Sequence, residues 1–338
     1  MSIAPDFVIE QPVGSLAIHD LSVGVAREGA PVVLAVHGIT ANGLSWRRVA
    51  DEVGRRHGPG AVRFLAPDLR GRGGSRGVPG PYGLAAHVED LASVASVFGA
   101  APHLVGHSMG AFVSALALAT HPERFSGAVL VDGGLAFPAP ADLDIDAALT
   151  AVIGPAMERL SLRFDGIDAY LAFWDAHPAL GPALRGPAGE AVRQYLTHDL
   201  VQHDGVERDG VERDGAGSGD VARPGGEEVT PERTGGWHSS CVIEAVRADG
   251  ADVLADPLTH GAVRKAVDLG KRVDLVWARR GLLNEPQGLY DEQRLSALDI
   301  PEAVRVTGVD SNHYDVILED PGVGIVADAI DRHLEAVG

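Results

Sequence analysis

One serine in the chain has the setting of a nucleophile. The segment GHSMG, residues 106–110, places Ser108 between two glycines, after a run typical of a buried strand and before an apolar helical pattern. On such a strand-to-helix turn the backbone is strained, and the serine hydroxyl is exposed above the edge of the sheet. Glycines are needed there because side chains would collide with neighbouring elements. The pattern predicts that Ser108 attacks a carbonyl group.

Two backbone amides are predicted to bind the negative charge that this attack creates. One is the N–H of Met109 at the start of the following helix, where free N–H groups favour negative charge. The other comes from HGIT, residues 37–40, at the end of an earlier strand, and is assigned to Ile39. His37 is expected to shape this loop beside the substrate pocket and not to transfer protons.

The general base is predicted in the last part of the chain. The segment VDSNHYDVIL places His313 after the final expected strand and just before the last helix. Most of the 14 histidines are scattered singly and are expected at the surface or in packing. The turn geometry points His107 away from its neighbour Ser108. His198 and His203 have a spacing that matches no zinc pattern, and both are expected on the surface.

A parallel sheet is needed to bring these residues together, and the periodicity predicts one. Short β-branched runs alternate with helical patterns, which is typical of an α/β fold, a mostly parallel sheet with helices on both faces. Strands are expected within Ala30–Gly38, Val62–Ser75, Pro102–Gly110, Ser126–Gly134, Arg272–Trp277 and Ala303–Val309, with an edge hairpin over Gly14–Ala26. Helices are expected over Gly83–Gly99, Ala111–Phe125 and about Gly322–Val337.

The pattern changes after Gly134, which predicts an inserted helical cap. Residues 135–200 show several short helical patterns with no buried strand between them. The segment 205–236 duplicates the pentapeptide GVERD and has almost no apolar residues, so a mobile loop is expected. The expected organisation is a core of residues 1–134 and 271–338 and a cap of residues 135–270.

Taken together, these motifs resemble the α/β-hydrolase fold superfamily. The resemblance covers Ala30–Gly134 and Arg272–Gly338, and it is carried by VHG, PDLRGRGGS, GHSMG, VLVDGG and the late NHY. It implies a serine-nucleophile hydrolase or esterase whose helical cap occupies the insertion. In the loop PDLRGRGGS, Asp68 and Arg70 are expected to brace the backbone and not to catalyse.

The acid of the implied catalytic triad is missing from its usual position. The family places it after the strand assigned to Arg272–Trp277, in the form G-x-x-D, whereas this chain has ARRG at residues 278–281. Asp132, at the end of the strand AVLVDGG, is one replacement, and Glu285, or less plausibly Asn284, further along the later loop is the other. We favour Asp132 because a residue at a strand end is held more rigidly than one in a loop.

The resemblance implies hydrolysis of a small carboxylic ester or lactone through an acyl-enzyme. Ser108 attacks, His313 takes its proton, Asp132 orients the imidazole, and water then releases the acyl group. Phe137, Tyr170 and Trp174 are expected to line the pocket from the cap. The same fold also hosts carbon–carbon bond hydrolases, lyases, cofactor-free peroxidases and non-catalytic receptors, so these alternatives remain open.

Composition limits the partners. The formal net charge of −19 disfavours nucleic acid and anionic membrane surfaces, which leaves a small-molecule substrate and, as an open alternative, a second copy in a homodimer. No phosphate-binding glycine motif is present, and the single cysteine, Cys241, excludes an internal disulfide and a cysteine zinc site. Neither a metal nor another cofactor is implied. The start of the chain lacks the features of a signal peptide, so a cytoplasmic location is expected.

Overall fold

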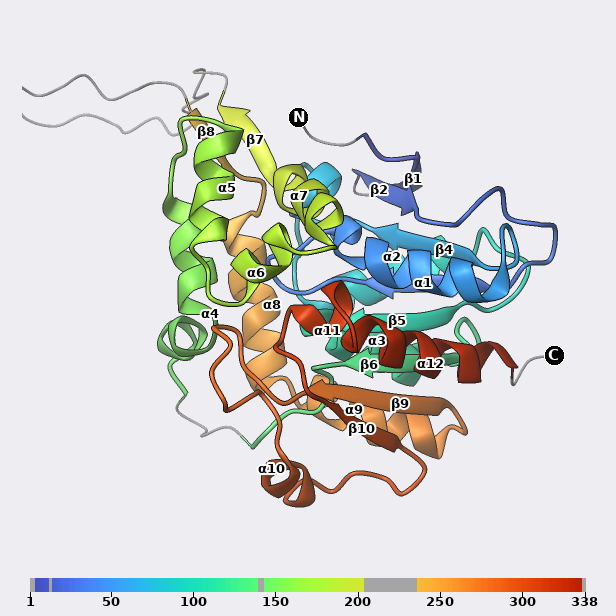
Figure 1. The fold of residues 1–338 in the computed structure, drawn as a ribbon. Helices are drawn as coiled ribbons and strands as arrows, with labels where there is room; N and C mark the ends of the chain where they lie inside the picture. Colours follow the sequence, from blue (N-terminus) through green and yellow to red (C-terminus); the bar gives the residue numbers. More distant parts are fainter. Residues whose placement is uncertain (1–3, 12–13, 139–142, 204–235, 336–338) are drawn as a thin grey trace, which may run out of the picture.

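The centre of the molecule is a twisted sheet in a computed structural model that describes residues 4–11, 14–138, 143–203 and 236–335 (Figure 1). Its eight strands in these ranges follow the order β1-β2-β4-β3-β5-β6-β9-β10. The β1–β2 and β2–β4 pairs are antiparallel and all other pairs are parallel, which confirms the predicted sheet. The strands are β1 (Phe7–Gln11), β2 (Gly14–Asp20), β3 (Val32–Val36), β4 (Arg63–Pro67), β5 (His103–His107), β6 (Gly127–Val131), β9 (Arg272–Ala278) and β10 (Arg305–Val309).

Helices cover both faces of this sheet, which explains why its central strands are continuous apolar runs. Every residue of β3, β5 and β6 is buried. Val33 and Ala35 face one apolar cluster, whereas Val32, Leu34 and Val36 face the other. The first cluster includes α1 (Arg47–His57), α11 (Asp315–Leu318) and α12 (Gly322–Glu335). The second includes α2 (Leu84–Ala95), α3 (Met109–Thr120), α9 (Pro257–Asp268) and α10 (Glu292–Ser296).

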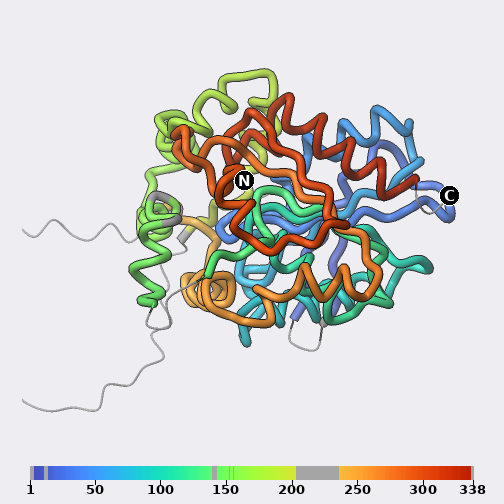
Figure 2. Tube along the Cα trace, turned by 90° about the horizontal axis from the view of Figure 1, so that it is seen from below, coloured from blue at the N-terminus to red at the C-terminus, as the bar shows by residue number. Residues whose placement is uncertain are grey.

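A second group of elements gathers at one end of the sheet. Figures 1 and 2 both place α4 at one end of the molecule and the end of α12 at the other. A short strand pair, β7–β8, accompanies these helices and was not predicted from the sequence. The group comprises α4 (Ile145–Ser161), α5 (Ile167–Asp175), α6 (Leu180–Arg185), α7 (Gly189–His198), β7 (Leu200–His203), β8 (Gly236–Ser239) and α8 (Ile243–Ala255).

Some boundaries differ from those predicted. The edge hairpin is formed by β1 and β2, and the segment 21–26 is not a strand, because Gly24 turns the chain with a φ of 76°. Helix α9, at the end of the predicted cap, packs in the same apolar cluster as α3. The division into core and cap therefore stays a prediction. The duplicated GVERD motif lies outside the described residues.

Two short 3-10 helices complete the described elements, η1 (Gly43–Trp46) and η2 (Gly73–Ser75). None of the helices in the described ranges combines the length and the apolar character that a bilayer crossing requires.

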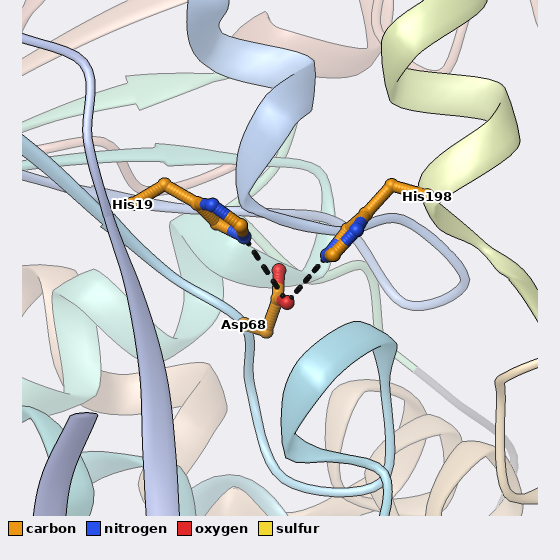
Figure 3. Close-up of side chains that lie close together, drawn as sticks. All are labelled: His19, Asp68 and His198. Atoms are coloured by element: carbon orange, nitrogen blue, oxygen red, sulfur yellow. Dashed lines mark hydrogen bonds and ion pairs between the residues drawn. The ribbon is translucent and has the colours of Figure 1, made fainter. Parts of the chain in front are cut away.

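A buried carboxylate joins α7 to the sheet. Asp68, just after β4, accepts hydrogen bonds from the Nε2 atoms of His19 on β2, at 3.2 Å, and His198 on α7, at 2.7 Å (Figure 3). The same carboxylate accepts from the backbone N–H groups of Gly43 and Gly74, each at 2.8 Å. The prediction that His198 lies on the surface is therefore wrong: its side chain is fully buried, because α7 packs over the loop that follows β4.

This cluster is also the set of residues best suited to a metal ion. The possible ligand atoms of His19, Asp68 and His198 lie within 4.8 Å of one another, and imidazole with carboxylate suits transition metals. Because the carboxylate already accepts four N–H groups, we assign the cluster to joining α7 to the sheet and to the loop that Asp68 was predicted to brace.

We predict that Asp68→Asn lowers the free energy of unfolding by about 3 kcal/mol, because removing one charged partner leaves buried donors poorly paired. Urea unfolding at pH 7.5 measures this change. Asp328→Asn is the control, since Asp328 is more than half exposed and forms a surface ion pair with Arg56. A loss no larger than that of the control would contradict the bracing role.

Candidate active site

The turn at Ser108 has the strained backbone that its motif predicts. Ser108 has a φ of 55° and a ψ of −122° between β5 and α3. Gly106 and Gly110 have no room for a side chain: a Cβ at Gly106 would overlap the carbonyl oxygen of Gly110, and one at Gly110 would overlap that of Val36. Both glycines of the motif are thus required by close backbone contact.

The loop after β3 approaches this turn. A Cβ added to Gly38 would lie 3.2 Å from the Cβ of Ser108, which shows how close the two segments are. Within the described chain, the N–H groups of Ile39 and Met109 have no hydrogen-bond acceptor. Both residues line a cavity together with Ser108. These two N–H groups are therefore available to a ligand.

His37 holds the loop and does not line a cavity that reaches Ser108. Its Nε2 accepts a hydrogen bond from the N–H of Leu69 at 2.9 Å, so the proton is on Nδ1, which donates to the carbonyl oxygen of Gly38 at 2.8 Å. Burial lowers the pKa of His37 from 6.5 to about 4. The imidazole is thus neutral at neutral pH, which fits the predicted role of His37 in shaping the loop. His37 does not, however, line the substrate pocket as predicted.

The structure brings His313 and Asp132 together. Asp132 lies directly after β6 with a φ of 44°, and its Oδ2 is 2.6 Å from Nδ1 of His313. Its Oδ1 accepts a hydrogen bond from the N–H of Ala278 at 3.0 Å. Asp132 is completely buried. A carboxylate that accepts from Nδ1–H fixes the imidazole tautomer and leaves Nε2 free to accept a proton.

Glu285 lies elsewhere. Its carboxylate accepts a hydrogen bond from the N–H of Leu283 at 2.7 Å, and its carbonyl accepts one from Gly281 at 3.0 Å. The loop after β9 therefore folds Glu285 back onto its own backbone, whereas Asp132 contacts His313.

His107 has a role that the sequence did not reveal. Its Nε2 donates a hydrogen bond to the backbone carbonyl of His313 at 2.8 Å. Burial lowers the pKa of His107 well below its usual value, so the ring is neutral. The residue before Ser108 thus fixes the backbone of His313.

Two cavities reach Ser108 from different sides. The smaller, of about 40 Å³, is also lined by His313, Tyr195 and Tyr314. The larger, of about 320 Å³, is almost entirely apolar and is lined by Ile39, Met109, Phe112, Leu135, Ala136, Phe137, Pro138, Leu143, Ala148, Leu149, Ile153, Gly250, Val253, Leu254 and Leu289. No arginine or lysine is among the described residues that line either cavity.

The aromatic residues predicted for the pocket divide between two places. Phe137 lines the larger cavity. Tyr170 and Trp174 line neither cavity, because they pack around the buried guanidinium of Arg159: the Tyr170 hydroxyl is 2.9 Å from Nη1 and the Trp174 ring centre is 5.3 Å from Cζ. Their position differs from the prediction because α5 packs against α6 and α7 and not over Ser108.

The low pKa of His37 predicts a pH-dependent stability. The unfolded chain binds a proton at His37 near pH 6.5 and the folded chain only near pH 4, so acidification favours unfolding. We expect the free energy of unfolding to fall through this pH range by up to about 3 kcal/mol from this group.

Urea unfolding at pH 7 and pH 4.5 tests this expectation in the wild type and in His37→Gln, which does not titrate. The variant should lose less stability between the two pH values than the wild type. An equal loss in both proteins would show that His37 is not the group involved.

Known proteins are similar to this chain in sequence and in fold. A family model described as alpha/beta hydrolase fold matches residues 31–179. Lipase LipV of Mycobacterium tuberculosis is 35% identical over 109 residues, which cover 32% of this chain and 39% of that protein. N-formylmaleamate deformylase of Pseudomonas putida is 30% identical over 150 residues, which cover 42% of this chain and 52% of that protein.

The chain thus spans about two fifths to one half of the length of these two relatives. Among solved structures, the thioesterase domain from the curacin biosynthetic pathway superposes with a TM-score of 0.61 at 18% identity, covering 96% of this chain and 98% of that domain. At this identity the likeness is one of fold.

Proposed function

Because the chain has the alpha/beta hydrolase fold, as its motifs predicted, we propose that it is a serine hydrolase that cleaves a small carboxylic ester or lactone. The observation that carries the proposal is the 2.6 Å contact between Nδ1 of His313 and Oδ2 of Asp132, with His313 and Ser108 lining the same cavity. The names of the similar proteins, a lipase, a deformylase and a thioesterase, support hydrolysis at a carbonyl carbon.

The proposed reaction has two halves, formation of the acyl-enzyme and its hydrolysis, and His313 transfers protons in both. Nε2 of His313 takes the proton of Ser108 while the hydroxyl oxygen attacks the carbonyl, and the imidazolium is stabilised by Asp132. The N–H groups of Ile39 and Met109 bind the oxyanion. His313 then gives the proton to the leaving alcohol. Water, activated by the same imidazole, attacks the acyl group and releases the acid and the free serine.

The position of His313 supports a proposed role for each of the two cavities. Since His313 must protonate the leaving oxygen, the alcohol part belongs in the small cavity of about 40 Å³ that His313 lines. The acyl part then occupies the larger cavity of about 320 Å³. An apolar wall without a cation favours a neutral alkyl or aryl acyl group over an acyl group that carries a carboxylate. We therefore propose an ester of an apolar acid with a small alcohol.

Substitution of the triad tests the proposed mechanism on ethyl butyrate, an ester of an apolar acid with a small alcohol, at pH 7.5. Ser108→Ala and His313→Ala should remove measurable turnover, and Asp132→Asn should lower kcat about 10⁴-fold, because the wrong imidazole tautomer is then favoured. Glu285→Gln is the matched acid-to-amide control and should stay within about twofold. A wild type that hydrolyses no ester would favour a receptor or a lyase. A large loss in Glu285→Gln alone would move the acid to the loop after β9.

The assignment of the acyl part to the larger cavity predicts that the enzyme prefers acyl chains of a particular length. Each methylene buried in the larger cavity contributes up to about 0.8 kcal/mol, so kcat/KM should rise up to about fourfold per methylene until the cavity is full. Ala148→Phe should shorten the preferred chain, because Ala148 lines this cavity. Ala147→Phe, at the exposed neighbouring position of α4, should leave the preference unchanged. The same profile in all three proteins would contradict the assignment.

A further inference from the structure

We infer that two buried arginines, Arg72 and Arg159, position the oxyanion loop of residues 38–40, and that carboxylates from the predicted cap hold both guanidinium groups in place. Neither arginine lines a cavity that reaches Ser108, so we assign them as positioning residues and not as catalytic ones. The inference rests on the proposed function for its catalytic consequence, but the loop geometry can be tested without turnover.

Arg72 holds the middle of the loop. Its Nε donates a hydrogen bond to the carbonyl oxygen of Ile39 at 3.0 Å. Its Nη2 lies 2.6 Å from Oδ2 of Asp249 on α8, and both side chains are completely buried. Asp249 also contacts Nε2 of His87 at 2.9 Å and accepts from the N–H of Gly83 at 2.8 Å. The position of the Arg72 guanidinium is therefore determined by a carboxylate that is itself fixed.

Arg159 holds the next residue of the loop. Its Nη2 donates to the carbonyl oxygen of Thr40 at 3.2 Å, and its Nη1 is paired with Asp199. Asp199 accepts further hydrogen bonds from the hydroxyl groups of Tyr170, at 2.6 Å, and Ser239, at 2.9 Å. Arg159 and the two residues that hold its guanidinium group, Tyr170 and Asp199, all come from residues 135–270.

Three consecutive carbonyl groups of the loop are therefore fixed by side-chain donors. That of Gly38 accepts from Nδ1 of His37, that of Ile39 from Arg72 and that of Thr40 from Arg159. In a planar trans peptide the N–H and C=O groups point in opposite directions. Anchoring the Gly38 carbonyl thus turns the N–H of Ile39 the other way, and the two guanidinium groups prevent the neighbouring peptides from rotating.

The need to orient the oxyanion loop explains why two arginines and their carboxylate partners are buried beside it. An oxyanion donor is effective only if it is oriented before the charge develops. A backbone loop without regular structure does not provide this rigidity, whereas a planar guanidinium with several donors can bridge a carbonyl and a carboxylate at once. Since Asp249 and Asp199 lie in the predicted cap, the cap completes the oxyanion site in addition to covering the cavity.

Arg72→Lys and Arg159→Lys test the inference, with Arg70→Lys as the matched control. Lysine keeps the charge but cannot bridge two acceptors in the same geometry. Arg70 forms an equally buried pair with Asp90, at 2.6 and 2.7 Å, and donates to the carbonyl of Pro81 and not to the loop. The first readout is hydrogen–deuterium exchange of the peptide that contains residues 37–41. The second is kcat and KM for ethyl butyrate.

We expect faster exchange of the loop peptide in Arg72→Lys and Arg159→Lys and wild-type exchange in Arg70→Lys. We also expect kcat to fall about 10- to 100-fold with KM within about threefold, a smaller loss than that of an oxyanion donor itself. Inhibition by butylboronic acid, which forms a tetrahedral adduct on serine, should weaken in parallel with kcat. If a lysine variant does not fold, Asp249→Asn or Asp199→Asn replaces it.

Unchanged loop exchange in both lysine variants would overturn the inference, as would an equal loss of kcat in Arg70→Lys. A wild type without ester hydrolysis would instead refute the proposed function. In that case the exchange measurement still decides whether the two arginines position the loop.

Discussion

The strained backbone at Ser108 is the constraint on which the arrangement of the site depends. A positive φ at a residue with a side chain costs about 1–3 kcal/mol and persists only where the surroundings leave no alternative. Here Ser108 is enclosed by the loop at Gly38, by the first turn of α3 and by Gly133, whose missing side chain makes room for the Ser108 backbone. The strands β3, β5 and β6 pair in parallel, so their carboxyl ends bring these segments to one point.

Local signals in the sequence were sufficient for the sheet and for the placement of Ser108. Continuous apolar runs predict buried parallel strands, and a glycine-flanked serine between a strand and a helix predicts a sharp turn. The same signals could not decide between Asp132 and Glu285, because the choice depends on which carboxylate faces the imidazole of His313. The distance from each carboxylate to His313 is set by the pairing of β6 with β9 and by the path of the loop after β9.

The buried charges could not be predicted from the sequence, because their partners lie on elements far apart in the chain. Arginine, aspartate and histidine are mostly exposed, so a surface position is the reasonable expectation for each one alone. His198, Arg159 and Asp199 are buried because α4, α7 and the neighbouring elements gather at one end of the sheet. An unpaired charge would be very costly there, so these residues pair with one another or bind backbone carbonyls.

The two arginines just before Gly281, the usual position of the acid, now have a structural explanation. Arg279 and Arg280 turn outward and pair with Glu292 and Asp310, both at the surface. An acid at position 281 would follow these two guanidinium groups directly in the chain, and they would compete with an imidazolium for its carboxylate. Asp132 avoids this competition, since one of its oxygens contacts His313 and the other is held by the N–H of Ala278. The acid usually follows β9. In this chain β9 instead supports Asp132, which follows the neighbouring strand β6, through the backbone N–H of Ala278.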